Sequence, residues 1–101
     1  MTRTPRSGES GKTVKLGQDL RIATAAATFN ALRDASRAKE PRVTLDGGQV
    51  EKADAAGLQA VLAGRGALAS AGKKVAWSGC TPQLRSAAEL LGLAEALELP
   101  R

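Results

Sequence analysis

Few side chains in this sequence are of the types that carry out chemistry. Histidine is absent, so no imidazole can serve as a general base or a metal ligand. Cys80 is the single cysteine, and a cysteine without a histidine partner is more often a small buried hydrophobe than a nucleophile. Asp46 and Asp54 could hold Mg²⁺ with a phosphate, but helix capping and loop hydrogen bonds explain both residues better. The sequence therefore predicts no enzyme, no catalytic residue, no metal site and no cofactor.

The segment GESGKT, residues 8–13, ends like a phosphate-binding loop. The pattern G-x-x-x-x-G-K-[ST] requires a glycine at position 6, where this chain has Arg6. Such a loop also follows a buried strand, and only five residues precede Arg6. We therefore predict that residues 1–12 are a flexible tail rich in glycine, serine and threonine, and that residues 13–101 form one domain.

The composition is that of a globular domain without a membrane span. The chain has 101 residues, 43% of them hydrophobic, and Phe29 and Trp77 are its two aromatic residues. No apolar run approaches the roughly 20 residues that cross a bilayer, and the amino terminus has no apolar stretch typical of a secretory signal. We expect a cytoplasmic protein that does not insert into a membrane.

The predicted tail raises the net positive charge of the chain. The net charge is +5, and residues 1–12 contribute +2 because Arg3, Arg6 and Lys12 are offset only by Glu9. Along the rest of the chain the signs are mixed, without the basic stripe and interleaved aromatics that nucleic-acid binders show. We expect no nucleic-acid partner.

Hydrophobic periodicity alternates between that of strands and that of helices. Thr24, Asp54 and Thr81 are placed as N-caps, and Pro82 adds a helix-start signal. This alternation predicts an α/β domain with right-handed parallel units. The expected elements are a strand or strand pair over 14–22, a helix over 23–38, a strand over 42–46, a helix over 54–72, a strand over 74–78, a helix over 81–91 and a short helix over 93–99.

Two of the predicted helix starts follow strands of the same sheet. The strand over 42–46 leads to Asp54, and the strand over 74–78 leads to Thr81. Because the carboxyl ends of parallel strands share one edge, we expect these two helix starts to converge near one surface. Capping alone would also explain both residues.

The segment VTLDGGQVEKADAAGLQAVLAGRGALASAGKKVAW, residues 43–77, resembles the centre of a STAS domain, the fold of bacterial anti-sigma factor antagonists. The resemblance extends over residues 14–98. It implies a small mixed sheet of about four strands flanked by helices, with partners contacted around the start of the second helix. The positions that match the family pattern are Asp46, Val50, Asp54, Gly57, Leu58, Gly72 and residues 91–93.

The sequence departs from the family pattern at the position of the phosphorylated serine. In antagonists that work by partner switching, a kinase phosphorylates a serine in an Asp-Ser-Ser-Gly motif, and this serine falls on Ala56 and its neighbour on Ala55. A phosphate there would add about 1.5 to 2 negative charges beside Asp54. Since alanine accepts no phosphate, we predict a constitutive docking surface without a phosphoswitch.

The resemblance also implies the kind of partner and the residues that contact it. We expect a protein partner in signalling, namely an anti-sigma factor or kinase or a chemosensory component. The alternatives are a STAS subunit of a lipid-transport ABC system and a domain that senses a nucleotide or another anion. A weak homodimer and modification of Ser78 or Thr81 are left open. The predicted contact residues are Asp46, Val50, Asp54, Ala55, Ala56, Gly57, Gln59 and Thr81.

Overall fold

Strands and helices alternate along residues 11–100, which are the residues that this computed structural model describes. The strands are β1 (Gly11–Lys15), β2 (Asp19–Leu20), β3 (Arg42–Gly47), β4 (Lys52–Ala53) and β5 (Lys74–Cys80). The helices are the 3₁₀ turn η2 (Ile22–Thr24), α1 (Ala25–Arg37), α2 (Ala55–Ser70), α3 (Pro82–Leu90) and α4 (Ala94–Leu97). The predicted α/β class is confirmed, with a parallel sheet flanked by helices.

The strands of the described chain form two small sheets. The first has the order β1-β3-β5 and the second pairs β2 with β4, and all these pairs are parallel. The resemblance implied a single mixed sheet of about four strands, so this detail differs. The reason is that α1 and α2 each carry the chain back across the sheet between successive strands of the first sheet, which makes those strands run in the same direction.

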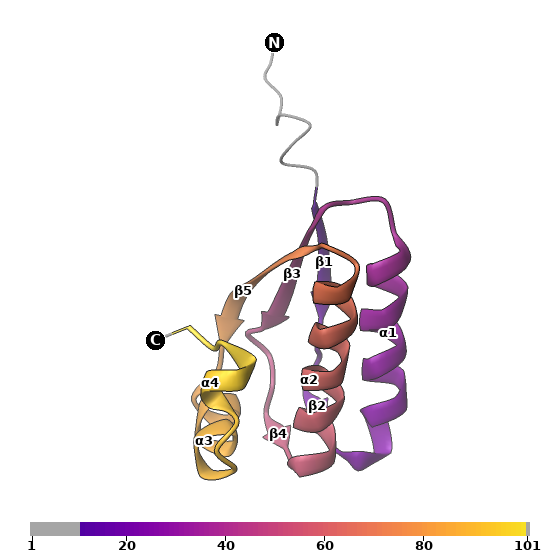
Figure 1. Cartoon of the computed structure of the whole chain (residues 1–101). Helices are drawn as coiled ribbons and strands as arrows, with labels where there is room; N and C mark the ends of the chain where they lie inside the picture. The colour runs from indigo at the N-terminus through magenta and orange to yellow at the C-terminus, as the bar shows by residue number, and fades with distance from the viewer. Residues whose placement is uncertain (1–10, 101) are drawn as a thin grey trace.

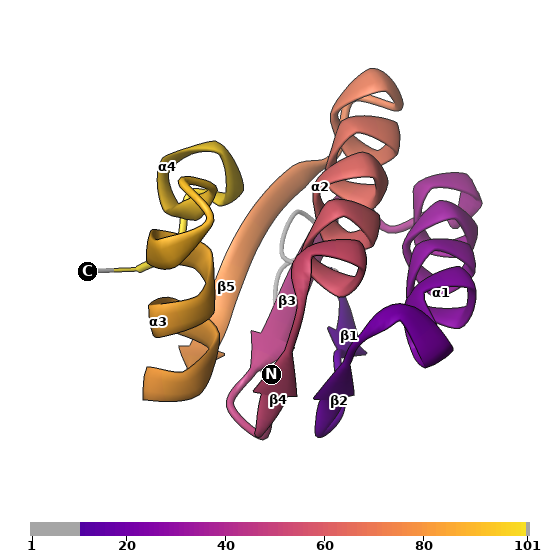
Figure 2. The same cartoon turned by 90° about the horizontal axis from the view of Figure 1, so that it is seen from below.

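One face of the β1-β3-β5 sheet is covered by helices. Figure 2 shows α1 and α2 on one side of this sheet, with α3 and α4 beside β5. Val14, Leu45 and Trp77 pair across the three strands and belong to the core or pack against it. The other face carries polar or small residues. The fully buried large side chains are Leu20, Leu32, Leu45, Leu58, Leu68, Leu84, Leu97, Val43, Val50 and Val61.

Helices α1 and α2 lie side by side along the sheet (Figure 1), and a glycine sets their closeness. A Cβ atom added at Gly64 of α2 would lie 2.3 Å from Cδ1 and 2.6 Å from Cβ of Leu32 in α1. Leu32 is fully buried. The close packing of α1 against α2 therefore requires glycine at position 64.

The carboxyl-terminal segment is tied to α2 and β5. The indole Nε1 of Trp77 donates to the carbonyl of Leu97 at 2.9 Å. The guanidinium of Arg65 donates to the carbonyl of Ala96 at 3.0 Å and to the carboxylate of Glu98 at 3.1 Å. Alternation with Val75 along the strand predicts that Trp77 faces the core, and the structure packs it against the core with its polar nitrogen satisfied.

The first predicted strand region differs most from the structure. Residues 14–22 form β1, a turn at Gly17 with φ of +78°, the short strand β2 and the beginning of η2. The even positions of Val14, Leu16, Leu20 and Ile22 predict that all four lie on the buried face of a strand, but the side chain of Ile22 is 74% exposed. The strand β1 also begins at Gly11, inside the segment predicted to be a tail, while residues 1–10 lie outside the described part of the chain.

The structure differs from the sequence-based predictions at the start of α1 and at the end of α3. Helix α1 ends at Arg37, and the ammonium group of Lys73 donates to the carbonyls of Ala38 and Glu40 that follow it. Thr24 precedes α1 but makes no side-chain cap to it. Leu91 continues the spacing of Leu84, Ala87 and Ala88 and is therefore expected on the apolar face of α3, but it follows the last residue of the helix and is 42% exposed.

Two glycines of α2 give opposite predictions for the same substitution. Gly64→Ala should lower the free energy of unfolding by about 1–3 kcal/mol, since the new methyl group overlaps Leu32. Gly66→Ala should raise it by about 0.5–1 kcal/mol, because a Cβ there meets no atom within 4 Å and alanine favours the helix. Urea unfolding followed by circular dichroism measures both. Equal effects of the two substitutions would contradict the described packing of α1 on α2.

Candidate functional site

The start of α2 is built around the carboxylate of Asp54. Its backbone is extended, with φ of −132° and ψ of 179°, and its Oδ1 accepts a hydrogen bond from the amide of Gly57 at 2.8 Å. Its other oxygen, Oδ2, accepts from the amide of Ile22 at 3.1 Å. One carboxylate therefore caps α2 and also fixes the beginning of η2, a segment 32 residues away in the sequence.

Gly57 allows the first turn of α2 to rest directly on the chain before η2. A Cβ atom at this position would lie 1.8 Å from the carbonyl oxygen of Leu20 and 2.8 Å from the amide nitrogen of Arg21. The amide of Asp54 also donates to the carbonyl of Leu20 at 3.0 Å. The glycine of the Asp-x-x-Gly-Leu pattern is thus required by backbone contact, and Leu58 after it is fully buried.

The turn η2 is held by its own polar side chains as well. The hydroxyl of Thr24 donates to the carbonyl of Asp19 at 2.8 Å and accepts from the amide of Arg21 at 3.3 Å. Asp19 and Arg21 form an ion pair at 2.8 Å, and the hydrogen bond from Arg21 lowers the pKa of the Asp19 carboxyl. Because this pair is exposed, it fixes geometry more than it stabilises the fold.

The start of α3 is built into a second group of contacts. The hydroxyl of Thr81 donates to the carbonyl of Val50 at 2.6 Å and accepts from the amide of Leu84 at 3.1 Å. The amide of Thr81 donates to the carbonyl of Gly47 at 3.3 Å. Asp46 accepts from the amide of Gly48 at 2.9 Å, which shapes the turn after β3. The capping role expected of Thr81 is confirmed.

The two helix starts therefore belong to separate groups of hydrogen bonds. Asp54 is linked to the residues around η2, whereas Thr81 is linked to Val50 and to Gly47 at the end of β3. The chain between Val50 and Asp54 includes β4, and Figure 1 shows β4 between α3 and the start of α2. The strand order predicted that the two helix starts converge near one surface, and the structure places them in two neighbouring groups that share no hydrogen bond.

The predicted contact residues differ in their exposure to solvent. Ala55 and Gln59 are exposed and Ala56 is half-buried. Val50 and Gly57 are buried, so they support the surface from within. The remaining three, Asp46, Asp54 and Thr81, are half-buried and occupied with the hydrogen bonds described above.

Each helix cap occupies one of the amides that an anion would use, that of Gly57 in α2 and that of Leu84 in α3. At α2 the cap is itself the carboxylate of Asp54, whose negative charge disfavours a second anion. Within residues 11–100 no group of three or more acidic, cysteine or histidine side chains could hold a metal ion. Cys80 is half-buried, and burial raises the pKa of its thiol, which disfavours the nucleophilic thiolate.

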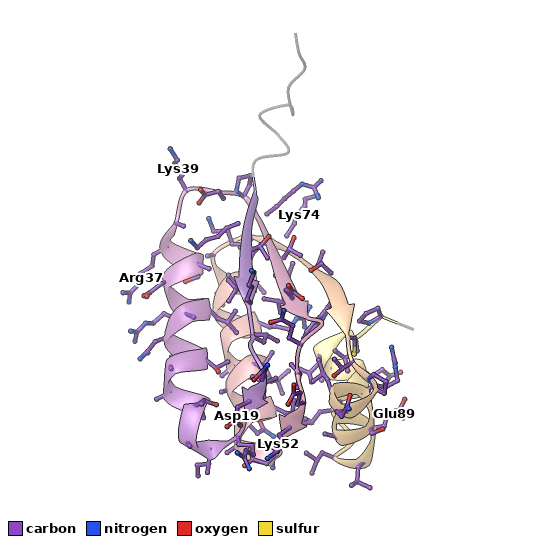
Figure 3. The ribbon with its side chains drawn as sticks, turned by 180° about the vertical axis from the view of Figure 1, so that it is seen from behind. Asp19, Arg37, Lys39, Lys52, Lys74 and Glu89 are labelled. Atoms are coloured by element: carbon purple, nitrogen blue, oxygen red, sulfur yellow. The ribbon has the colours of Figure 1, made fainter. Side chains whose placement is uncertain are left out.

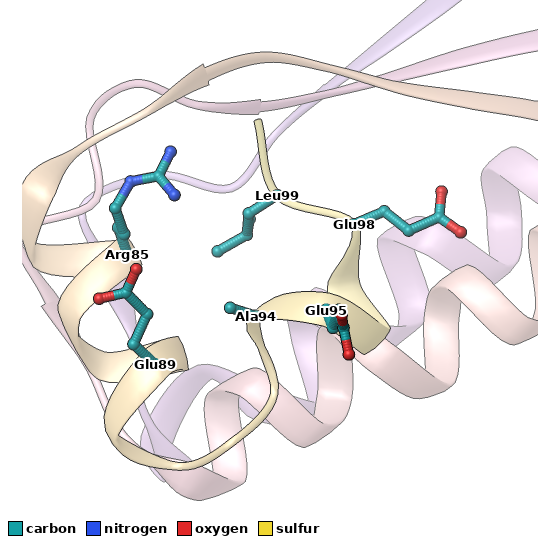
Figure 4. A pocket seen from close by; sticks show the side chains of 6 residues that line it. All are labelled: Arg85, Glu89, Ala94, Glu95, Glu98 and Leu99. Carbon is teal, nitrogen blue, oxygen red and sulfur yellow. The ribbon is translucent and has the colours of Figure 1, made fainter. Parts of the chain in front are cut away.

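A surface hollow of about 780 Å³ lies between α3 and α4 (Figure 4). Arg85 and Glu89 line it from α3, and Ala94 and Glu95 from α4. A second hollow of about 370 Å³ includes Arg65 and Lys73 in its lining. The first lining is mostly charged, the second combines charged with aliphatic residues such as Leu62 and Val75, and neither hollow contains a predicted contact residue.

Sequence reasoning missed Ile22 as a member of the site. It follows the same even-numbered apolar pattern as Val14, Leu16 and Leu20, which placed it in a strand. The structure places it next to Asp54 through the hydrogen bond to its amide. Figure 3 shows Asp19 and Lys52, which pair in the β2–β4 sheet beside this turn, at the opposite end of the molecule from Lys39 and Lys74.

Comparisons with known proteins agree with this architecture. A family model described as "Mlab, STAS domain" matches residues 4–100. A crystal structure titled "sulfate transporter family protein from Wolinella succinogenes" superposes with a TM-score of 0.72 and 19% identity, covering 95% of this chain and 75% of that chain. At this identity the likeness shows the fold alone. A search of the curated proteins finds no match, and no helix between residues 11 and 100 is long and apolar enough to cross a membrane.

The dual cap predicts how Asp54 responds to substitution. Asp54→Ala should lower the free energy of unfolding by about 1–2 kcal/mol, because the amides of Gly57 and Ile22 both lose their acceptor. Asp54→Asn keeps one good side-chain acceptor for the cap and should cost less. Urea unfolding measures stability, and amide hydrogen exchange at Ile22 and Gly57 measures the two contacts. Unchanged exchange at Ile22 in Asp54→Ala would contradict the bridge between the two segments.

Proposed function

Because this chain belongs to the STAS domain family, we propose that it is a non-catalytic module that binds a protein partner through the start of α2, without a phosphoswitch. STAS domains generally mediate protein interactions. The observation that carries the proposal is the position of Ala55 and Ala56 in the first turn of α2. Their methyl groups lie at a fixed surface, because the cap of Asp54 and the close approach at Gly57 hold this turn in place.

The absence of a switch follows from the chemistry of the surface. Ala55 and Ala56 carry no hydroxyl group. Thr81, which was left open as a substitute, uses its hydroxyl as a donor to Val50 and as an acceptor from Leu84. A phosphate on Thr81 would remove the hydrogen that the hydroxyl donates to Val50 and would place a bulky group against that carbonyl, so modification there would cost a structural bond.

The partner that we propose belongs to cytoplasmic signalling, as an anti-sigma factor, a kinase or a chemosensory component. This choice rests on the resemblance of the α2 start to anti-sigma factor antagonists. A second candidate is a transporter subunit, such as a component of a lipid-transport ABC system. The likeness to a structure titled as a sulfate transporter family protein favours this candidate. The anion-sensing alternative has less support at α2, since the carboxylate of Asp54 already occupies that helix start and would repel an anion.

Ala56→Asp should abolish docking and preserve the fold. An acidic residue in the first turn of a helix is tolerated or stabilises by about 0.3–1 kcal/mol, so the melting temperature should change little. A buried charge without a counter-charge costs several kcal/mol at an interface, so partner binding should weaken at least about tenfold. Capture from a cell lysate on immobilised protein, with quantitative mass spectrometry, compares the variant with the parent.

Asn30→Asp is the matched charge control. Asn30 is exposed on α1, so the substitution adds the same charge outside the proposed interface. We expect one protein to be retained by the parent and by Asn30→Asp and to be depleted by Ala56→Asp. Its identity as a signalling protein or a transporter subunit distinguishes the two candidates. Equal capture of that protein by the parent chain, Ala56→Asp and Asn30→Asp would place the interface away from α2.

A further inference from the structure

One end of the molecule gathers half of the basic side chains of the described residues. It is formed by the start of β1, the end of α1, the start of β3 and the turn from α2 into β5. The strand register places Gly11 beside Arg42 and Arg42 beside Lys74. The ammonium of Lys73 donates to the carbonyls on either side of Lys39. The cations of this basic end are Lys12, Arg37, Lys39, Arg42, Lys73 and Lys74.

The basic end carries a charge that the rest of the domain does not share. Glu40 is the acidic side chain among its six cations, and Arg33 and Asp34, one turn earlier in α1, cancel each other. The basic end therefore has a net charge of +5, whereas residues 11–100 have twelve basic and nine acidic side chains and a net charge of +3. The remainder of the described chain is net −2. Figure 3 shows Lys39 and Lys74 at the end opposite to Asp19, so net charge is separated along the molecule.

The fold uses only part of this positive charge. Lys73 binds carbonyls that follow α1, and Arg37 in the last turn of α1 complements the helix dipole. Arg42 and Lys74, in contrast, are exposed neighbours on parallel strands about 5 Å apart, where like charges repel. Neither ion pair between described residues includes any of the six cations. An anionic partner would relieve the repulsion that the fold leaves here.

The arrangement of the cations favours a broad, planar partner. They come from separate segments around one end of the domain and do not line a groove, since the larger hollow contains none of them and the smaller contains Lys73 alone. Neither aromatic residue of the chain belongs to the basic end, so bases have no stacking platform there. The exposed large apolar side chains of the described residues, Ile22, Leu90 and Leu91, lie on other segments. Binding at the basic end would therefore be electrostatic and without insertion.

We propose that the basic end binds an anionic membrane surface, with its cations against acidic phospholipid headgroups. Clusters of about four to eight Lys or Arg side chains are typical of binding to acidic lipids, and each contributes about fivefold to affinity near the surface. The start of α2 lies at the other end of a 16-residue helix, about 24 Å away. The proposed docking surface thus faces away from the membrane, and this inference does not depend on the proposed function.

Sedimentation with sucrose-loaded vesicles tests the proposal. The parent chain, Lys74→Glu and Lys52→Glu are each mixed with vesicles of phosphatidylcholine alone and of equal parts phosphatidylcholine and phosphatidylglycerol. The two variants have the same substitution and net charge, but Lys52 is exposed at the opposite end (Figure 3). We expect the parent to bind only the acidic vesicles. Lys74→Glu should weaken this binding at least about tenfold and Lys52→Glu less than about twofold, because Lys52 lies beyond a Debye length of about 10 Å at 0.1 M salt.

Two further measurements separate lost binding from lost structure. Lys74→Glu places an opposite charge beside Arg42, so its melting temperature should equal or exceed that of the parent. Lys39→Glu, at an exposed position of the same end, should also weaken vesicle binding. Because the Debye length falls to about 3 Å at 1 M salt, the parent should leave the acidic vesicles at that concentration.

Other outcomes would overturn the proposal. These are no binding to acidic vesicles at low salt, equal binding to neutral vesicles, binding that persists at 1 M salt, or equal weakening by Lys74→Glu and Lys52→Glu. Duplex DNA bound more tightly than acidic vesicles, with the same loss in Lys74→Glu, would replace the membrane with a nucleic acid. Ala56→Asp should bind vesicles like the parent, and Lys74→Glu should capture the protein partner like the parent, so the two proposals fail separately.

Discussion

The carboxylate of Asp54 joins the two segments on which the proposed docking surface depends. It caps α2 through the amide of Gly57 and holds η2 through the amide of Ile22. Since each oxygen serves a different segment, the position of Ala56 on α2 is coupled to that of Ile22 on η2. A carboxylate has two oxygen atoms and can accept from the amides of Gly57 and Ile22 separately. A serine or threonine at this position would have a single side-chain oxygen, so it could not place one oxygen at each amide. The surface is therefore assembled by a capping interaction that serves the fold and the site together.

Close approach of backbones is the second constraint on this corner of the molecule. Gly57 rests on the carbonyl of Leu20, and Gly64 makes room for Leu32. These two contacts fix α2 against β2 and against α1. An interface carried by such a helix needs little rearrangement on binding, which is consistent with a surface that is always ready to dock.

The sequence allowed the parallel architecture and both helix caps to be predicted, because they depend on local signals. Strands separated by helix-length segments must return in parallel, and Asp54 and Thr81 stand where an N-cap is needed. Ile22 was misplaced because its even position continued the strand period by coincidence after the turn at Gly17. The separation of the two helix starts was missed because it depends on the extended path from Val50 to Asp54, which periodicity does not encode. Tertiary hydrogen bonds across 32 residues, such as that of Ile22 to Asp54, leave no local signal.

Chemical-shift mapping of the complex tests the account most directly. Two-dimensional amide spectra of the ¹⁵N-labelled chain, recorded with and without the purified partner, report contacts residue by residue. The account predicts that the changes concentrate at residues 22–24 and 55–59. Changes confined to the opposite face of the sheet, at Thr13, Thr44 and Ala76, would contradict it.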